Sequence, residues 1–446
     1  MALGGGKFTS MNKQLAGAYV NTISEPKALS LFGDRGTVAV ALTSNYGNKG
    51  EIIKLKSRDF ELRCSELFGY DVWADEVKNI RELMSKATEI YVYQLAENVK
   101  AKNDIAVAKR GGTRGNDISI KIQTNINDET KKDVITMVDD LAVDIQTVNE
   151  VGQLSPNKYV EFLPSADISE NVVKKSLEGG TTGTATIKEH TEFLARMESE
   201  TFDVLLCPYI EKEVQQIYMS FTKRLRNEIG ILFALVLQSI KGENLDFYDD
   251  EGIVAVYNTV LDENSTGTEL TYYTAGLYAS TPIGVSNIGA KYSGEYEVDT
   301  NLTQLQLVDL KNSGKFVYHK EGEDVIVLED INTLVTTTEV KGEEFKENQV
   351  IRVVDALSIA DAQLFTKTFI GSNIDLASME SFQNGLVAIR EKFVDEKALR
   401  DFDKDSIIVS TVEGQRGSIK ATSGVVPPDC FKKLYLTNVL LRKDIK

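Results

Sequence analysis

Residues 324–338 read DVIVLEDINTLVTTT, and residues 341–357 read KGEEFKENQVIRVVDAL. Two periodicities meet in this stretch. Just before and within its first part, the β-rich runs 316–319 and 325–328 flank the polar turn KEGED. Short β-rich runs separated by a polar turn are typical of a hairpin, so we predict one here.

The second part of the stretch has a helical period. Thr338 and the Gly-Glu-Glu that follows shortly after it predict a helix start, and the acidic residues suit the positive end of a helix dipole. We expect the helix over about 343–369, with Gly371 ending it. Its apolar face is predicted from residues spaced by threes, fours and sevens: Val350, Val353, Val354, Leu357 and Leu364.

Composition limits the classes of protein that fit. The chain has 446 residues, of which 42% are hydrophobic and 26% charged, as in ordinary globular proteins. A chain of this length normally forms more than one hydrophobic core, so several domains are expected. The net charge of −17 argues against non-specific binding to nucleic acid or to anionic membranes, since either needs a basic face. It suits a protein that stays soluble before it assembles, although colloidal stability alone is an equal explanation.

The cysteines suit a reducing compartment, and the apolar runs of the sequence do not predict a membrane span. Cys64, Cys207 and Cys430 are too few and too scattered for a disulfide framework or a zinc site. The longest apolar run, near 230–237, is far too short to span a bilayer. The N-terminus has no apolar core like that of a signal peptide. We therefore expect no membrane insertion and no cofactor.

The order of patterns along the chain predicts an α+β multidomain fold. Alternating strand and helix patterns indicate α/β core domains, while residues 118–163 show only alternating β-type runs. The expected parts are an N-terminal arm at 1–24, an α/β domain at 25–100, an inserted all-β sandwich-like domain at 101–165, a middle α/β domain at 166–320, a mixed α/β C-terminal domain at 321–430 and a C-terminal arm at 431–446. The basic, glycine-rich link 108–116 is interpreted as a flexible loop leading into the β domain.

The residues disfavour catalysis and metal binding. A serine-protease triad needs a histidine beside a nucleophile, but the only histidines, His190 and His319, lie in a helical run and at a hairpin turn. Gly5-Gly6-Lys7 lacks the spacing of a phosphate loop. The acidic run 401–405 lacks the glycine and closing glutamate of a calcium loop, so we interpret it as a solvated turn.

Several stretches together resemble contractile-tail sheath proteins. The Asp330-Ile-Asn-Thr-Leu block and the helix after it resemble the C-terminal domain of that family. The start MALGGGKF, the run RGTVAVAL at 35–42, the GTRGNDI at 112–118 and the final KLYLTNV at 433–439 are similar to it in the same order. The resemblance implies a β-sandwich domain for 101–165 and a non-catalytic, subtilisin-like segment for 166–320.

Both ends of the chain carry a strand pattern beyond a glycine- or proline-rich break. A terminal strand can pair within its own domain or add to a sheet edge of a neighbour, which needs little beyond alternation. The resemblance implies the second use, with arms that pair with C-terminal domains of neighbouring subunits. The residues expected to do so are Tyr19, Val20, Thr22, Ile23, Leu434, Tyr435, Leu436, Thr437, Val439 and Leu440.

The resemblance further implies a structural, non-enzymatic subunit that polymerises around an inner tube and contracts to drive the tube through a cell envelope. Implied partners are further copies in stacked, hexameric rings, the tube protein, the baseplate and a tail terminator, in a tail assembled in the bacterial cytoplasm. The polar side of the 343–369 helix, with Lys346, Gln349 and Arg352, is the candidate tube contact, unless it merely faces solvent. A non-contractile surface-layer protein and an α/β enzyme remain as alternatives.

Overall fold

The computed structural model describes residues 35–240, 242 and 247–440, which form two compact units. The first comprises the described residues up to Tyr248, with Gly252–Ser280 and Ser293–Asn301. The second comprises Asp249–Glu251, Thr281–Tyr292 and the described residues from Leu302 onward. The N-terminal arm, with Tyr19, Val20, Thr22 and Ile23, lies outside the described residues.

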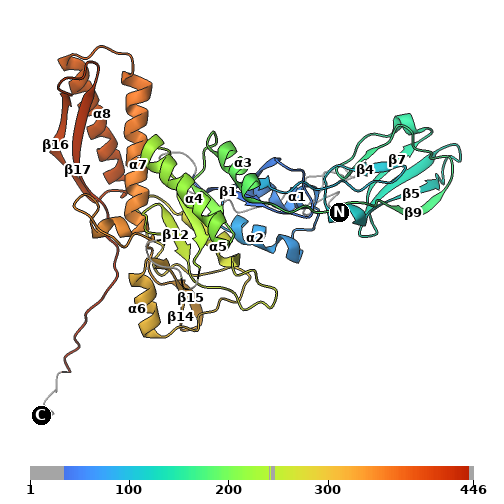
Figure 1. Ribbon diagram of the computed structural model, residues 1–446, viewed down its shortest axis with the longest axis horizontal. Coiled ribbons are helices and arrows are strands. Elements are labelled where there is room, and N and C mark those ends of the chain that lie inside the picture. Colours follow the sequence, from blue (N-terminus) through green and yellow to red (C-terminus); the bar gives the residue numbers. More distant parts are fainter. Residues whose placement is uncertain (1–34, 241, 243–246, 441–446) are drawn as a thin grey trace, which may run out of the picture. The chain divides into compact units, whose positions relative to one another are not determined.

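A largely parallel sheet organises the first unit (Figure 1). Its strands follow the order β12-β11-β10-β1-β3-β2, and only β2 runs antiparallel to its neighbour. Parallel strands require crossover connections, which the helices between them supply. The strands are β1 (Thr37–Leu42), β2 (Ile52–Lys56), β3 (Glu89–Gln94), β10 (Val204–Cys207), β11 (Ala234–Gln238) and β12 (Ile253–Val256).

Helices cover both faces of this sheet, so its central strands are apolar on both sides. On one face, Ala39 and Leu205 pack with Phe193 of α3 and Tyr218 of α4. On the other, α5 packs on β1, β10, β11 and β12 and also contacts α2. The helices are α1 (Ser57–Phe68), α2 (Lys78–Met84), α3 (Ile187–Met197), α4 (Lys212–Arg224) and α5 (Glu269–Ser280).

An all-β region is inserted between β3 and α3. Its main sheet has the order β7-β6-β5-β9, and β4 pairs with β8. Strand β9 lies beyond residue 165, where the β region was expected to end. Its Val172 pairs with Ile122 of β5, so residues up to Ser176 continue this sheet. The strands are β4 (Ala106–Ala108), β5 (Ile118–Thr124), β6 (Lys132–Val138), β7 (Leu141–Val148), β8 (Val160–Phe162) and β9 (Val172–Ser176).

The second unit contains the hairpin and the long helix expected from the sequence. The hairpin is confirmed, with Tyr318 paired to Val327 and a turn at Gly322. The helix begins later than expected, at Asn348, because Glu347 is extended and bridges to Ile331. The elements are α6 (Gln304–Asn312), β13 (Lys315–Phe316), β14 (Tyr318–Glu321), β15 (Asp324–Val327), α7 (Asn348–Leu364), α8 (Leu376–Asp395), β16 (Asp401–Thr411) and β17 (Ile419–Val426).

Strands β16 and β17 pair with each other and pack on α8. Phe382 and Leu386 of α8 form a small core with Ile407 of β16. The acidic run at 401–405, interpreted from sequence as a solvated turn, is instead the start of β16. Its carboxylates are exposed, and the register shifts between Asp403 and Ile408, which places the run in an irregular strand.

Candidate assembly surfaces and the framework behind them

The segment 427–440 follows β17 and forms no helix or strand. Of the C-terminal arm at 431–446, the structure describes residues 431–440. Its large apolar side chains are exposed, whereas such side chains normally gain about 1.5–3 kcal/mol on full burial. Lys432 forms an ion pair with Glu347, which anchors the root of the arm. The relative exposures are Phe431 104%, Leu434 84%, Tyr435 89%, Leu436 69%, Val439 75% and Leu440 95%.

The expected strand at 431–440 therefore has no partner within the described chain. Its alternation is present in the sequence, but a strand needs a neighbour for its backbone hydrogen bonds. Thr437 lies in the same exposed stretch. The interpretation that this segment pairs inside its own domain finds no support among the described residues.

Strand edges of the kind that could accept such an arm are present in the second unit. The β16–β17 hairpin is a two-stranded sheet, so within the described residues the outer edge of each strand has no paired strand. Exposed edges present unpaired N–H and C=O groups that act as a template for another strand. Figure 1 shows the hairpin beside α8.

The three candidate tube contacts are not equivalent. Lys346 is partly exposed and pairs with Glu343 at 2.9 Å. Gln349 and Arg352 are 3% and 1% exposed, so neither lies on an exposed side of the helix, which both the predicted tube contact and its solvent-facing alternative require. They face inward because they satisfy backbone carbonyls there: Gln349 Nε2 donates to the Gly284 oxygen at 2.6 Å, and Arg352 Nη2 donates to the Val285 oxygen at 2.6 Å.

The carboxylate of Asp330 accepts hydrogen bonds from several groups around the start of α7. Its carboxylate accepts a hydrogen bond from Arg352 Nη2 at 2.7 Å and from the Asn287 backbone N–H at 2.9 Å. The other carboxylate oxygen accepts from Asn348 Nδ2 at 3.0 Å. Buried charge is tolerated only when paired and hydrogen-bonded, which is the case here. The DINTL block thus ties the start of α7 to the 281–292 segment.

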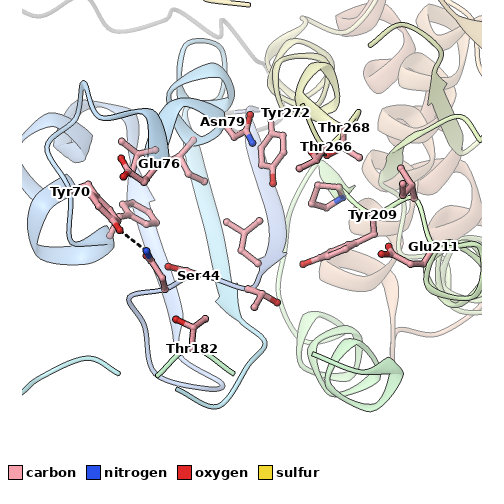
Figure 2. A pocket seen from close by; sticks show the side chains of 18 residues that line it. Ser44, Tyr70, Glu76, Asn79, Thr182, Tyr209, Glu211, Thr266, Thr268 and Tyr272 are labelled. Atoms are coloured by element: carbon pink, nitrogen blue, oxygen red, sulfur yellow. Dashed lines mark hydrogen bonds between the residues drawn. The ribbon is translucent and has the colours of Figure 1, made fainter. Parts of the chain in front are cut away.

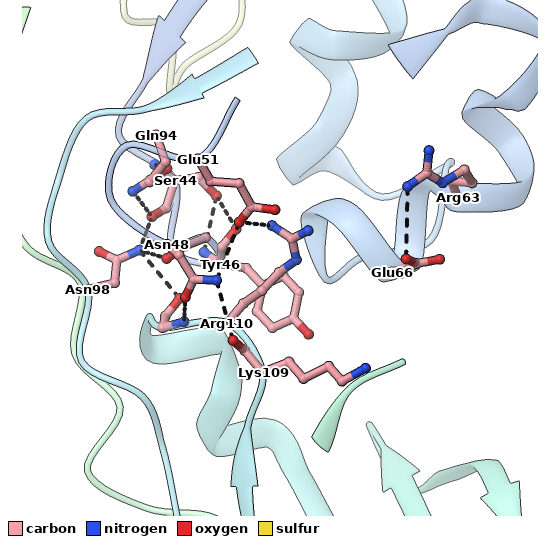
Figure 3. Close-up of polar contacts among 12 residues, drawn as sticks. Ser44, Tyr46, Asn48, Glu51, Arg63, Glu66, Gln94, Asn98, Lys109 and Arg110 are labelled. Carbon is pink, nitrogen blue, oxygen red and sulfur yellow. Dashed lines mark hydrogen bonds and ion pairs between the residues drawn. The ribbon is translucent and has the colours of Figure 1, made fainter. Parts of the chain in front are cut away.

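The link at 108–116 is not the flexible loop expected from its composition. Arg110 pairs with Glu51 at 2.7 Å, and Asn48 Oδ1 accepts a hydrogen bond from the Gly111 N–H (Figure 3). Asn98 Nδ2 donates to the carbonyls of Ser44 and Gly47 in the same place. These bonds join the loop after β1 to the 108–116 link, through which the chain enters the main β sheet of this region.

Arg114 completes this junction and is 7% exposed. It donates to the Gly69 carbonyl at 2.7 Å and to Asp139 at 2.5 and 2.7 Å, and it stacks on Tyr70. Burial by itself disfavours its charge, but the hydrogen bonds that Arg114 donates to the carboxylates of Asp139 and Asp117 outweigh this effect and raise the pKa of Arg114. The sequence signal was only a basic glycine-rich run, which does not reveal that the arginine is buried.

His190, Cys64 and Cys207, which were considered for catalysis or metal binding, are buried. His190 is 3% exposed, contacts the Tyr218 hydroxyl at 3.1 Å, and has its pKa lowered by burial. Burial raises the pKa of Cys64 to about 12 and that of Cys207 further, so neither thiol is activated. Among the described residues, no group of side chains could hold a metal ion, and none of the helices has the length and hydrophobicity of a membrane-spanning segment.

Comparison with known proteins identifies two family regions. Residues 183–333 match the phage tail sheath protein central domain, and residues 96–185 match the phage tail sheath protein beta-sandwich domain. The latter region includes β9, in agreement with its pairing to β5.

Relatives match along nearly the whole chain. The protein YqbK of Bacillus subtilis (strain 168) is 30% identical, covering 97% of this chain and 99% of its own. The phage-like element PBSX protein XkdK of the same organism is 29% identical, with the same coverage. A tail sheath protein of Clostridium phage phiCD119 is 26% identical over 50% of this chain and 60% of its own.

Solved structures of sheath tail proteins are also similar to this chain. The sheath tail protein of Desulfitobacterium hafniense is 28% identical with a TM-score of 0.79, covering 92% of this chain and 97% of its own. That of Listeria innocua is 27% identical with a TM-score of 0.72, covering 91% and 95%. The contracted sheath of the anti-feeding prophage, at 12% identity and a TM-score of 0.56, shares the fold. The chain belongs to the phage tail sheath protein family and is a structural subunit of a tail sheath.

Proposed function

We propose that this chain polymerises helically around an inner tube and that the resulting sleeve contracts to drive the tube through a cell envelope. The sheath tail proteins of similar sequence support the sleeve. Two contracted assemblies, the anti-feeding prophage sheath and the PVC sheath complex, share the fold and motivate the contraction.

Two observations carry the proposal: the apolar side chains of the C-terminal arm are exposed, and the β16–β17 sheet has outer edges without a paired strand among the described residues. Leu434, Tyr435, Leu436, Thr437, Val439 and Leu440 would add as a strand to the β16–β17 edge of a neighbouring copy. Such strand addition takes its affinity from main-chain hydrogen bonds and its specificity from alternate side chains. The N-terminal arm at 1–24, with Tyr19, Val20, Thr22 and Ile23, would serve in the same way.

The energetics suit a polymer better than a dimer. About six to eight backbone hydrogen bonds at roughly 0.5–1.5 kcal/mol each contribute on the order of 3–12 kcal/mol. Ordering the same residues costs about 1–2 kcal/mol each. The two terms nearly cancel, so the burial of exposed apolar side chains such as Leu434 and Leu440 decides the balance. One arm binds weakly, and many arms in a closed assembly bind firmly.

Partners and location follow from the same role. The proposed partners are further copies in stacked hexameric rings, the inner tube protein, a baseplate and a tail terminator. The baseplate is proposed because the chain shares its fold with a protein in the baseplate structure of the anti-feeding prophage. The subunit has no enzymatic activity of its own and assembles in the bacterial cytoplasm into a virion tail or tail-like particle. The C-terminal domain at 321–430 remains in place through its arms while the rest of the subunit moves.

Electron microscopy of the purified protein tests the proposal. The full-length chain should form hollow sleeves or helical tubes. A chain lacking residues 431–446, and a full-length triple variant with Leu434→Asp, Leu436→Asp and Leu440→Asp, should stay monomeric with an unchanged circular dichroism spectrum. The matched control is Leu305→Asp on α6, which replaces a leucine of similar exposure (71%) outside the arm.

The outcomes separate the alternatives. Tubes lost in both arm variants but kept in Leu305→Asp support strand exchange through the arm. Tubes that form equally well without residues 431–446 exclude the arm mechanism. Tubes that never shorten when an assembled tail is triggered favour a non-contractile, surface-layer-like role.

A further inference from the structure

A cleft of about 630 Å³ opens in the first unit. It is lined by residues that directly follow β1, such as Ser44, and by Tyr209 and Glu211, which follow β10. The next two strands of the chain, β2 and β3, lie on one side of β1, whereas β10, β11 and β12 lie on the other. The cleft therefore lies at the carboxyl ends of parallel strands at a topological switch point, the usual place of ligand sites in open α/β sheets.

Two walls with similar chemistry face each other across the cleft (Figure 2). Tyr70 and Glu76 lie on one side, and Tyr209 and Glu211 lie on the other. Each wall thus combines an aromatic ring with a carboxylate. Neither carboxylate forms an ion pair with any residue that the structure describes.

Tyr272 provides a buried polar group aimed into this space. It comes from α5 and is 6% exposed, and Figure 2 shows its hydroxyl pointing between the two walls. The hydroxyl makes no hydrogen bond to another described residue. The hydroxyl thus faces the cleft with its capacity to donate and accept a hydrogen bond unused by the described residues, so a ligand with a hydrogen-bonding group is the natural complement. Burial raises the pKa of Tyr272, which keeps the phenol neutral.

The charge of the cleft disfavours an anion. Its 18 lining residues include Glu76 and Glu211 but no lysine, arginine or histidine. The nearby N-terminus of α5 would attract an anion, but Glu269 already occupies it: its carboxylate accepts from the Thr266 N–H at 2.6 Å and from the Ser265 hydroxyl at 2.8 Å. Aromatic rings with carboxylates beside them are the pattern that binds organic cations.

We propose that this cleft binds an organic cation, an alkylammonium or guanidinium group, held between Glu76 and Glu211 with the tyrosine rings around it. Two sources supply that chemistry. One is the basic end of a second copy, since the last 20 residues carry five basic residues against two acidic ones in a chain of net charge −17. The other is a free polyamine. The cleft itself does not depend on the proposed polymerisation.

Isothermal titration of the full-length protein tests this with three probes. They are a peptide of residues 437–446, the same peptide with Arg442→Gln, Lys443→Gln and Lys446→Gln, and spermidine. The first and third are expected to bind, and the double variant Glu76→Gln/Glu211→Gln should bind them roughly tenfold more weakly. Glu61→Gln, an exposed acid on α1 outside the cleft, is the matched control and should bind normally.

Each outcome decides the question. Binding of the basic peptide that its glutamine version lacks assigns the site to a second copy, and binding of spermidine alone assigns it to a free cation. The inference is overturned if no probe binds, if Glu76→Gln/Glu211→Gln binds as well as the unaltered chain, or if inorganic phosphate competes. Tube formation by the double variant is scored separately by microscopy, so failure here leaves the sheath proposal intact.

Discussion

The guanidinium of Arg352 donates a hydrogen bond of 2.7 Å to the carboxylate of Asp330, with side-chain exposures of 1% and 2%. The two residues lie 22 positions apart, one in the DINTL block and one on α7. The pair also binds the 281–292 segment through Asn287 and Val285. One buried ion pair therefore joins three chain segments of the second unit.

Removal of either partner from this pair should strongly destabilise the second unit. Arg352→Met leaves the Asp330 carboxylate buried without its cation, a change that costs about 3–5 kcal/mol in comparable buried pairs. Urea unfolding followed by circular dichroism measures this. The control is Arg400→Met, because Arg400 and Asp429 form an exposed pair worth about 0–1 kcal/mol. Equal losses from the two variants would contradict the buried role of Arg352.

Substitution of Gly112 by alanine should destabilise the junction between the sheet and the β region. Gly112 has φ +123°, and an added Cβ would lie 1.9 Å from the Asn45 carbonyl oxygen. Neither the backbone conformation nor the contact can be accepted without displacement, so we expect a loss of about 2 kcal/mol or more. Gly152→Ala is the control, because its Cβ would meet nothing within 4 Å. A Gly112→Ala chain as stable as Gly152→Ala would show that the junction yields easily.

The stability of the first unit should rise with pH as the pH passes up through the ordinary histidine pKa of about 6.5, because of His190. Burial lowers the pKa of His190 in the folded chain, so the unfolded chain binds more protons as the pH falls through the ordinary value of about 6.5. The contribution is complete above that value and is lost below it. His190→Gln should flatten the dependence, as measured by urea midpoints from pH 5 to 8. An unchanged slope in this variant would assign the dependence to other groups.

Thiol reactivity should distinguish the three cysteines. Cys64 and Cys207 are fully buried and burial raises their pKa, whereas Cys430 is partly exposed just before the arm. An aromatic disulfide reagent should therefore modify one thiol per chain rapidly in the native protein and three in denaturant. Cys430→Ser should abolish the fast phase. A second fast equivalent would mean that one core strand or helix opens easily.

Local sequence patterns were sufficient to predict the helices and strands whose apolar residues follow a regular period. The alternating strand and helix patterns predicted α/β domains, and the alternating β-type runs from Ile118 onward predicted the β region. The hairpin before α7 and the apolar face of that helix were also predicted, because periodicity depends only on which side is buried. The resemblance to sheath proteins rested on the same local stretches taken in order.

The positions of the polar side chains were decided by tertiary structure. Periodicity placed Gln349 and Arg352 on a polar side of α7, yet both are buried. Gln349 donates to the Gly284 carbonyl, and Arg352 donates to the Val285 carbonyl and to Asp330. Composition predicted a flexible loop for the 108–116 link, yet Arg114 donates hydrogen bonds to the Gly69 carbonyl and to the Asp139 carboxylate. A polar side chain is exposed or buried according to whether a distant group satisfies its hydrogen bonds, and residues far apart in sequence are brought together only by folding. For the same reason the alternating pattern at 431–440 specifies a strand, but not the sheet with which it pairs.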